Sequence, residues 1–381
     1  MHAKTIKGKD PKQIASELSI AMADGFAPTL AVVFLSIKQD RKEISSILDD
    51  EGISIYGVTT AGEFIDGEVG EESTAILLMD IDKKYFVVDF KDTSNQDTKE
   101  AAIEMGKHGL EVFKHPTFVV SGSGVTADGE KIIRGIEAAV GEEVIIFGGM
   151  AGDDFTMTGT YVFTNNMDTD NGIVSIIFDG DHISLNGLAT CGWKAIGVVR
   201  TVTKSEGCWV YTIDNEPALD MIIKYMGITH LDKDKTNEII LNIGANFPLQ
   251  MQRETGNVVM RTAMLANWAD HSFMCAGNVP VGSKVRFTIP PDFDVIDQIV
   301  SECSEIKEKS NFNADAMLLF SCKARHIALG PLVSKEIEGL QKVWDVPMAG
   351  YFTYGEFGKS SKGRQEFHNI TCCWVAISEV Q

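Results

Sequence analysis

The stretch that decides the fold is IYGVTTAGEF, residues 55–64, because the chain repeats its pattern near the other end as AGYFTYGEF, residues 349–357. Both copies begin with an apolar segment and end in Gly-Glu-Phe. A looser third copy, MAGDDF, occupies residues 150–155. We therefore predict that one structural unit occurs more than once in this chain. The alignment of the two clear copies pairs Gly57 with Gly350, Thr60 with Thr353, Gly62 with Gly355, Glu63 with Glu356 and Phe64 with Phe357.

Each copy stands at the end of a strand–helix–strand pattern. The first unit has an apolar strand at 30–36, then Asp40 and Glu43 at capping-box spacing ahead of a helix, then a strand at 53–58. Units of this kind build sheets with helices packed on them. We predict a mixed α/β fold of duplicated strand–helix–strand units. The later units have strands at 117–124 and 144–149, and at 316–322 and 346–357, the last pair around a helix expected to begin at Ser334.

The chain of 381 residues is long enough for two or three domains. A polar, charged segment, LDKDKTN at 231–237, separates two blocks that lie between the second and third copies. We predict two domains. Residues 1–230 would hold two repeated units and a connecting segment, and residues 231–381 a strand-rich block and the third unit.

Composition narrows the class of protein. The chain has 54 acidic and 34 basic residues and a formal charge of −20, which disfavours nucleic acid and anionic membranes as partners. No run approaches eighteen apolar residues, and the first residues lack the apolar segment of a signal peptide. The seven cysteines form no C-x-x-C pair, as is typical of reduced thiols. We expect a cytoplasmic protein that does not insert into membranes.

Ligands of open α/β sheets bind where strands end, so the repeated turns predict a binding site. Clustered acids would repel one another by roughly 3 kcal/mol at about 5 Å, and a ligand ammonium group would relieve this repulsion. Arginine suits a ligand carboxylate, and aromatic rings suit the pocket walls. The predicted ligand-binding residues are Thr59, Thr60, Gly62, Glu63, Gly152, Asp153, Asp154, Arg261, Arg325, Tyr351, Thr353, Tyr354, Gly355 and Glu356.

Several alternatives stay open at this point. Each turn could be purely architectural, because glycine also serves tight packing and positive φ angles. Arg261 lies alone in an apolar strand and is either edge-exposed or buried with a partner. Glu63 and Glu356 could form an acid/base pair of an enzyme, although no catalytic motif is recognised. The pair Cys322 and His326 has no second pair to complete a zinc site, so no metal residue is predicted.

Taken together, GVTTAGEF, FGGMAGDD, FSCKARH, AGYFTYGEFG and FHNIT resemble the FIST family, from about residue 25 to residue 378. The order is that of its N-terminal domain followed by its C-terminal domain, and residues 205–227 resemble the segment that joins them. The resemblance implies a small-ligand sensory module of bacterial and other signalling proteins, with amino acids as suggested ligands. Some members resemble haem-binding nitric-oxide sensors. The family has no established catalytic residues.

The resulting hypothesis is a cytoplasmic sensory protein for an amino acid or similar zwitterion. The chain has no kinase, cyclase or coiled-coil segment, so we expect a separate signalling partner, namely a kinase, a cyclase or a chemotaxis component. We expect no cofactor. A haem-binding gas sensor is kept as an alternative, with His115, His271 and His368 as candidate ligands, although no C-x-x-C-H motif is present. A hydrolase of a small amino- or sugar-like substrate is the third alternative.

Overall fold

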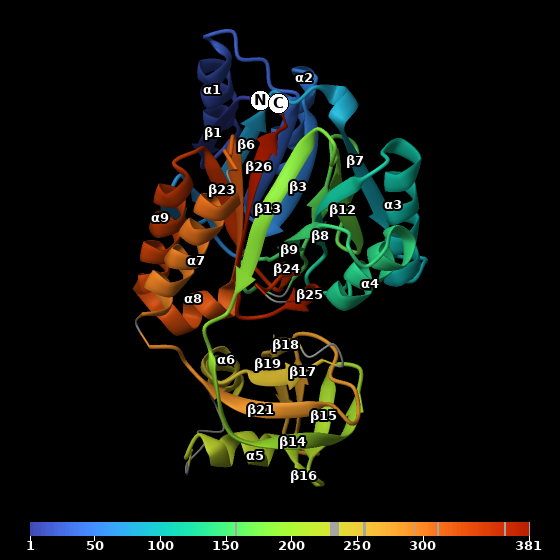
Figure 1. The fold of residues 1–381 in the computed structure, drawn as a ribbon, viewed down its shortest axis with the longest axis vertical. Helices are drawn as coiled ribbons and strands as arrows, with labels where there is room; N and C mark the ends of the chain where they lie inside the picture. The colour runs from blue at the N-terminus through green and yellow to red at the C-terminus, as the bar shows by residue number, and fades with distance from the viewer. Residues whose placement is uncertain are drawn as a thin grey trace.

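The structure, a computed structural model, has two lobes, a large body and a small lobe of residues 194–289 (Figure 1). The two chain ends lie side by side on the body, at the end away from the small lobe. Among the described residues, none of the helices is long and apolar enough to cross a membrane. The described residues are 1–156, 158–228, 236–253, 257–292, 294–310, 312–361 and 363–380.

The body contains three repeats of one chain order: strand, helix, strand, helix, strand, hairpin and returning strand. The small lobe is inserted into the third repeat, between its first strand and its first helix. The first repeat is β1 (Ala3–Gly8), α1 (Pro11–Met22), β2 (Leu30–Ser36), α2 (Arg41–Asp50), β3 (Ser54–Thr60), β4 (Glu63–Ile65), β5 (Glu68–Gly70) and β6 (Thr74–Met79). The second is β7 (Phe86–Asp92), α3 (Thr98–Val112), β8 (Pro116–Gly122), α4 (Gly129–Val140), β9 (Ile146–Met150), β10 (Val162–Phe163), β11 (Asp168–Thr169) and β12 (Gly172–Asp179). The third is β13 (Ile183–Thr190), α7 (Val295–Ser310), β22 (Ala316–Cys322), α8 (Lys323–Leu329), α9 (Val333–Trp344), β23 (Met348–Thr353), β24 (Glu356–Lys359), β25 (Gln365–His368) and β26 (Cys372–Glu379).

The three repeats exchange their hairpins in a cycle. Their sheets have the equivalent orders β1-β6-β2-β3-β10-β11, β7-β12-β8-β9-β24-β25 and β13-β26-β22-β23-β4-β5. The central pairs β2–β3, β8–β9 and β22–β23 are parallel. The last two strands of each sheet come from another repeat: the first repeat gives its hairpin to the third, the third to the second, and the second to the first. Each repeat therefore completes its sheet only with strands from a neighbour.

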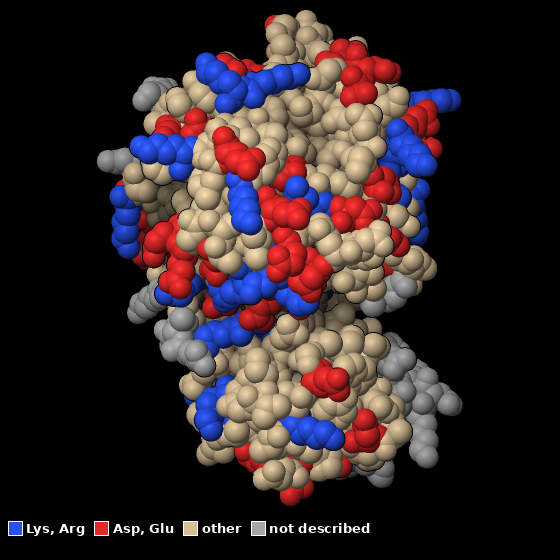
Figure 2. All heavy atoms as spheres, turned by 90° about the vertical axis from the view of Figure 1, so that its right-hand side faces the viewer, with Lys and Arg blue, Asp and Glu red and all other residues tan. Residues whose placement is uncertain are grey.

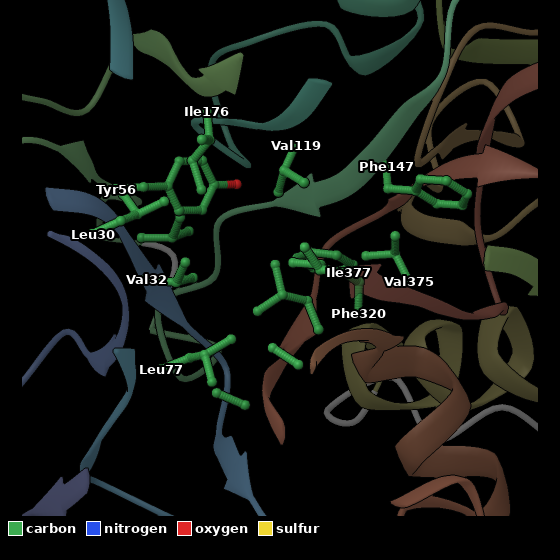
Figure 3. Packing of buried hydrophobic residues seen from close by; sticks show 14 of the residues in the cluster. Leu30, Val32, Tyr56, Leu77, Val119, Phe147, Ile176, Phe320, Val375 and Ile377 are labelled. Carbon is green, nitrogen blue, oxygen red and sulfur yellow. The ribbon is translucent and has the colours of Figure 1, made fainter. Parts of the chain in front are cut away.

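Strand alternation builds two kinds of core from the same strands. Along β2, Leu30, Val32 and Phe34 face a central core, whereas Ala31 and Val33 belong to an outer core that includes residues of α1 and α2. The central core receives side chains from all three sheets, as Figure 3 shows. The second and third repeats each have an outer core of this kind between their strands and their helices. The body is thus three helix-covered sheets around one shared interior.

The small lobe has its own core and a curved sheet. Its strand order is β18-β17-β21-β14-β15-β20-β19. The first and last strands of this order, β18 and β19, are consecutive in the chain and separated only by Thr262, so the two ends of the sheet come together there. Its elements are β14 (Lys194–Glu206), β15 (Trp209–Ile213), β16 (Glu216–Pro217), α5 (Ala218–Tyr225), α6 (Thr236–Asn246), β17 (Leu249–Gln252), β18 (Val258–Arg261), β19 (Ala263–Asn267), β20 (Ser272–Cys275) and β21 (Lys284–Ile289).

The structure confirms the predicted fold class, a mixed α/β protein of repeated units in two lobes. Asp40 caps α2 by accepting a 3.1 Å hydrogen bond from the Glu43 N–H. The helix expected to start at Ser334 begins at Val333, so Ser334 lies inside it. The predicted boundary between residues 230 and 231 lies outside the described residues, and α5 and α6 on either side of it both belong to the small lobe.

Candidate functional site

The three turns meet where the strands β3, β9 and β23 end, on the side of the body that faces the small lobe (Figure 1). Backbone hydrogen bonds join them in a closed cycle, so each turn contacts both others. We call this arrangement the turn ring. Its bonds run from Phe352 N–H to Gly62 O (2.8 Å), Ala61 N–H to Phe352 O (3.0 Å), Met150 N–H to Gly355 O (2.7 Å), Tyr354 N–H to Met150 O (3.2 Å), Gly152 N–H to Thr59 O (2.8 Å) and Asp154 N–H to Thr60 O (3.1 Å).

The exchanged hairpins explain why the repeated motif has glycine at the aligned positions 57 and 350. A Cβ atom on Gly57 would lie 2.2 Å from the ring of Phe163, and one on Gly350 would lie 2.1 Å from the ring of Phe64. Both phenylalanines come from a hairpin that another repeat supplies. Glycine is required here because the incoming ring occupies the space of a side chain.

The two glutamates of the motif have matching partners inside the protein. The hydroxyl of Thr353 donates to Oε1 of Glu356, and Thr371 donates to Oε2 from its backbone N–H (3.2 Å) and its hydroxyl (2.8 Å). In the first repeat, Thr60 and Ser73 bind Glu63 in the same pattern. Burial raises the pKa of both glutamates to about 7. Each carboxyl group thus ties a hairpin to the start of the returning strand.

The third turn differs in its acids. Asp153 is fully buried and accepts hydrogen bonds from the Tyr354 hydroxyl (2.6 Å) and the Thr158 N–H (2.7 Å). Burial and the neighbouring Asp153 raise the pKa of Tyr354. Asp154 is half-buried and accepts a 2.5 Å hydrogen bond from the Ser36 hydroxyl through Oδ2. Asp154 is therefore the predicted acid whose carboxylate retains access to solvent.

Two further predicted residues are part of the packing. The Tyr351 hydroxyl donates to Gly149 O at 2.8 Å, and its ring lies in the central core. The Thr59 hydroxyl donates to Gly152 O at 2.8 Å and accepts from the Tyr161 N–H at 2.8 Å. Both side chains connect the second repeat with another repeat.

Both predicted arginines are fully buried and already bind glutamates. Arg325 forms three hydrogen bonds of 2.6–3.1 Å with the carboxylate of Glu336. For Arg261, the structure decides the alternative left open by the sequence, because the side chain is buried and its Nη2 lies 3.1 Å from Oε2 of Glu130. Neither guanidinium lines the pocket between the lobes.

That pocket lies beside the turn ring. The body contributes Lys323, Thr353 and Tyr354, and the small lobe contributes mainly apolar side chains. About 20 Å³ of free space remains inside, enough for about one water molecule. The complete lining is Phe155, Leu241, Thr262, Met264, Ala276, Cys322, Lys323, Ala324, Ile327, Thr353, Tyr354 and Asn369.

Lys323 is a pocket residue that the sequence reasoning missed. Its Nζ atom lies 3.3 Å from Nδ1 of His326, and 5.2 and 5.8 Å from the ring centres of Phe352 and Phe155. Within the described part of the chain, no carboxylate oxygen lies within 4 Å of this ammonium group. Burial lowers its pKa, against the opposing charges of Glu71, Asp154 and Glu63. The sequence contained an indication of this residue, because in FSCKARH Lys323 is a cation directly after the buried strand β22.

A second missed residue is Thr262, on the small-lobe side of the pocket. Its side chain is 2% exposed, and its hydroxyl has no hydrogen-bond partner among the described residues. Its backbone N–H donates across the lobes to Oδ1 of Asn369 at 3.4 Å. A buried hydroxyl without a partner is costly, so it marks a place where a ligand or water atom would be stabilising.

The three candidate haem ligands lie in different surroundings. His115 pairs with Asp181 and His271 with Asp220, both on the surface. His368 is buried, its Nε2 lies 3.2 Å from Gly358 O, and burial lowers its pKa to about 4. None of these histidines lines the pocket between the lobes.

Models of known protein families match most of this chain. The family model for the FIST N domain matches residues 29–216, and that for the FIST C domain matches residues 218–359. Because these matches cover most of the chain, the protein belongs to the FIST family. FIST domains are associated with sensory proteins of signal transduction. The two matches meet inside the small lobe, between β16 and α5. A search of curated proteins finds no match.

Proposed function

We propose that this protein is a cytoplasmic sensor that binds an amino acid or a similar small zwitterion in the pocket between its lobes. The observation that carries the proposal is Lys323, whose half-buried ammonium group lines the pocket and contacts no carboxylate of the described residues. A charge removed from water is stabilised by a counterion, and the carboxylate of a ligand would supply one.

The surroundings of Lys323 favour a ligand that carries both charges. Asp154 acts on Lys323 electrostatically without contacting it, and only its Oδ2 accepts a hydrogen bond from the described residues. Its other oxygen would accept the ligand ammonium group. Leu241 and Met264 would contact an apolar side chain, and the free hydroxyl of Thr262 would bind a polar ligand atom. In this proposal Lys323 takes the place of the predicted arginines. Asp154, which the sequence analysis had already predicted, supplies the acid, although it is not among the residues that line the closed pocket.

Binding would change the relation between the lobes. An amino acid is larger than the space that remains, so the small lobe must move from the body to admit it. The chain crosses between the lobes twice, between β13 and β14 and between β21 and α7, so these crossings would form the hinge. A ligand that fits one arrangement better than another shifts their populations, and a separate signalling protein would respond to that shift.

A thermal-shift screen of amino acids tests this proposal, with native mass spectrometry to detect bound ligand. A ligand at one hundred times its Kd should add about 2.7 kcal/mol to the free energy of unfolding. We expect Lys323→Met to weaken binding about 10- to 100-fold, because a charge-assisted hydrogen bond is worth roughly 1.5–3 kcal/mol.

The matched control is Lys342→Met, since the side chain of Lys342 is 74% exposed on α9. It should bind as the unmodified protein does. The absence of any shift with the amino acids would contradict the ligand class, and equal binding by both variants would contradict the role of Lys323.

A further inference from the structure

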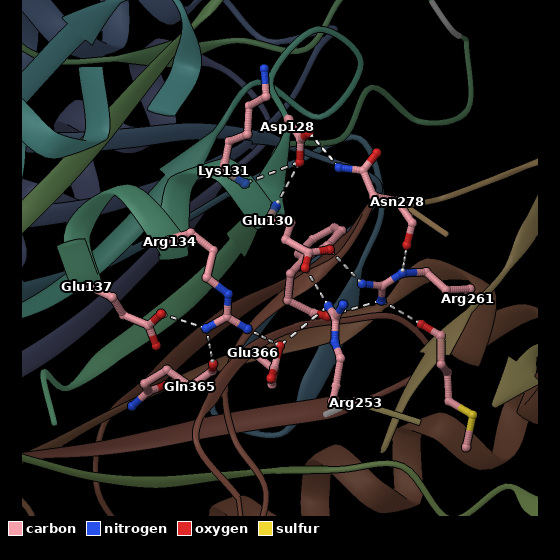
Figure 4. A network of polar contacts seen from close by, with 12 residues as sticks. Asp128, Glu130, Lys131, Arg134, Glu137, Arg253, Arg261, Asn278, Gln365 and Glu366 are labelled. Atoms are coloured by element: carbon pink, nitrogen blue, oxygen red, sulfur yellow. Dashed lines mark hydrogen bonds and ion pairs between the residues drawn. The ribbon is translucent and has the colours of Figure 1, made fainter. Parts of the chain in front are cut away.

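A second contact between the lobes is made by charged side chains rather than by the apolar pocket wall. Acidic and basic side chains gather at the junction of the lobes in Figure 2, and Figure 4 shows their contacts. We call six of them the junction cluster. These are Glu130, Arg134 and Glu137 of α4, Glu366 of β25, and Arg253 and Arg261 of the small lobe.

Glu130 makes the shortest ion pairs between the lobes, and Oε2 of Glu366 also lies 3.5 Å from Nη2 of Arg253. Oε1 of Glu130 lies 2.7 Å from Nη2 of Arg253, and its Oε2 lies 3.1 Å from Nη2 of Arg261. Beside Glu130, Nδ2 of Asn278 donates to Oδ2 of Asp128 at 3.0 Å. The body thus holds the small lobe through these two carboxylates and one adjacent hydrogen bond.

The cluster is balanced only while the lobes are in contact. Together its members are three arginines and three glutamates. Removal of the small lobe would take away Arg253 and Arg261 and leave three glutamates with Arg134. The side chains of Glu366 and Glu130 are 2% and 18% exposed, so water screens these ion pairs poorly while the lobes are in contact. Breaking a partly buried ion pair is far more costly than breaking an exposed one.

The junction cluster and the hinge contact different parts of the body. Both chain crossings adjoin the third repeat, next to β13 and α7, whereas the cluster lies on α4 of the second repeat and on β25, a strand of its sheet. The small lobe is therefore held covalently on one side and by charges on another. It can turn about the crossings only when the cluster separates.

From these contacts we infer that the ion pairs of the junction cluster that cross between the lobes, those of Glu130 and Glu366 with Arg253 and Arg261, are a latch. They keep the small lobe closed over the pocket, and their release opens the pocket to ligand. The role in ligand entry rests on the proposed function. The latch itself is a property of the protein without ligand and can be tested without one.

Hydrogen exchange measured by mass spectrometry on ligand-free protein tests the latch. The reporter peptides contain Thr262 and Asn369, which are hydrogen-bonded across the junction. We expect Glu130→Gln to accelerate their exchange about tenfold, because the two arginines lose their shared charge. Sodium chloride at about 0.5 M should accelerate the exchange of the unmodified protein in the same direction.

Glu137→Gln is the matched control. It lies on the same helix, but Glu137 binds Arg134 within the body, at 2.6 Å. Arg253→Gln removes a partner from the other lobe and should act as Glu130→Gln does. Exchange at the original rate in both Glu130→Gln and Arg253→Gln would overturn the latch, and so would equal acceleration by Glu137→Gln. If amino acids fail to bind while Glu130→Gln still opens the junction, only the ligand proposal falls.

Discussion

The turn ring and the lobe junction lie next to each other but differ in how their polar groups are used. In the ring, the carboxyl groups of Glu63 and Glu356 are bound by hydroxyl and N–H groups of the body itself. At the junction, Lys323 has no carboxylate in contact among the described residues, and the hydroxyl of Thr262 has no partner among them. The repeated residues thus build the architecture, while two polar groups that occur once have no such partners among the described residues.

The largest expected effect comes from Gly350→Ala in the ring. Its Cβ would lie 2.1 Å from the Phe64 ring and 2.2 Å from the backbone oxygen of Leu319, which cannot move without disturbing β22. We expect a loss of about 3 kcal/mol or more in the free energy of unfolding, measured by urea denaturation. Gly52→Ala is the control. It has a φ of +69° but no atom within 4 Å of a Cβ, and it should cost only about 1–2 kcal/mol. Similar losses in both variants would show that the ring does not need the glycine for space.

The next effect is on the pH dependence of stability. Burial raises the pKa of Glu356 to about 7 in the folded state, above the ordinary glutamate value of 4.5. The stabilisation from the bound proton is complete below about pH 4.5 and is lost as the pH rises to about 7. The loss reaches at most about 3 kcal/mol, at 1.36 kcal/mol for each pH unit.

Glu356→Gln should therefore remove its part of the slope of the stability curve between about pH 4.5 and 7, leaving the part due to Glu63, and the variant should be more stable than the original protein at pH 8. Denaturation at several pH values measures this, above the sequence pI of about 4.8. Glu111→Gln, at an exposed position, should leave the curve unchanged. A variant with the original slope would show that Glu356 does not carry this proton.

The smallest expected effects are on the free energy of unfolding, and they should differ in sign between the turn ring and the lobe junction. Thr59→Val removes a hydroxyl that donates to Gly152 O and accepts from the Tyr161 N–H, so it should lose about 1–2 kcal/mol. Thr262→Val removes a buried hydroxyl without a partner, so stability should stay equal or rise by up to about 1 kcal/mol. Thermal denaturation of both variants makes the comparison. A loss for Thr262→Val as large as that for Thr59→Val would mean that its hydroxyl is bonded in solution.

The sequence predicted those parts of the fold that depend on local patterns. The strand β2 follows from a continuous apolar run, and the caps of α1 and α2 follow from Asp10 and Asp40, which act within a few residues. The hairpin exchange was not predictable, because Phe64 and Gly350 pair across the whole chain and nothing local distinguishes this pairing from one within a repeat.

The candidate site was predictable in part. The repeated turns follow strands β3, β9 and β23 in the sequence, and the structure brings the three turns together at the ends of these strands. The choice between Arg325 and Lys323 was not predictable, because the two lie two residues apart and only tertiary packing places Arg325 against Glu336. The same holds for Arg261 and Glu130, which come from different lobes.

The exchange of hairpins also sets the order in which the protein can be completed during synthesis. When the second repeat has left the ribosome, β10 and β11 can complete the first sheet, but β4 and β5 still have no sheet to join and β9 has no neighbour on one side. Both positions are filled only by β23 and β24, near the end of the chain. A nascent chain of two repeats therefore carries open strand edges, which favour aggregation, until the third repeat arrives.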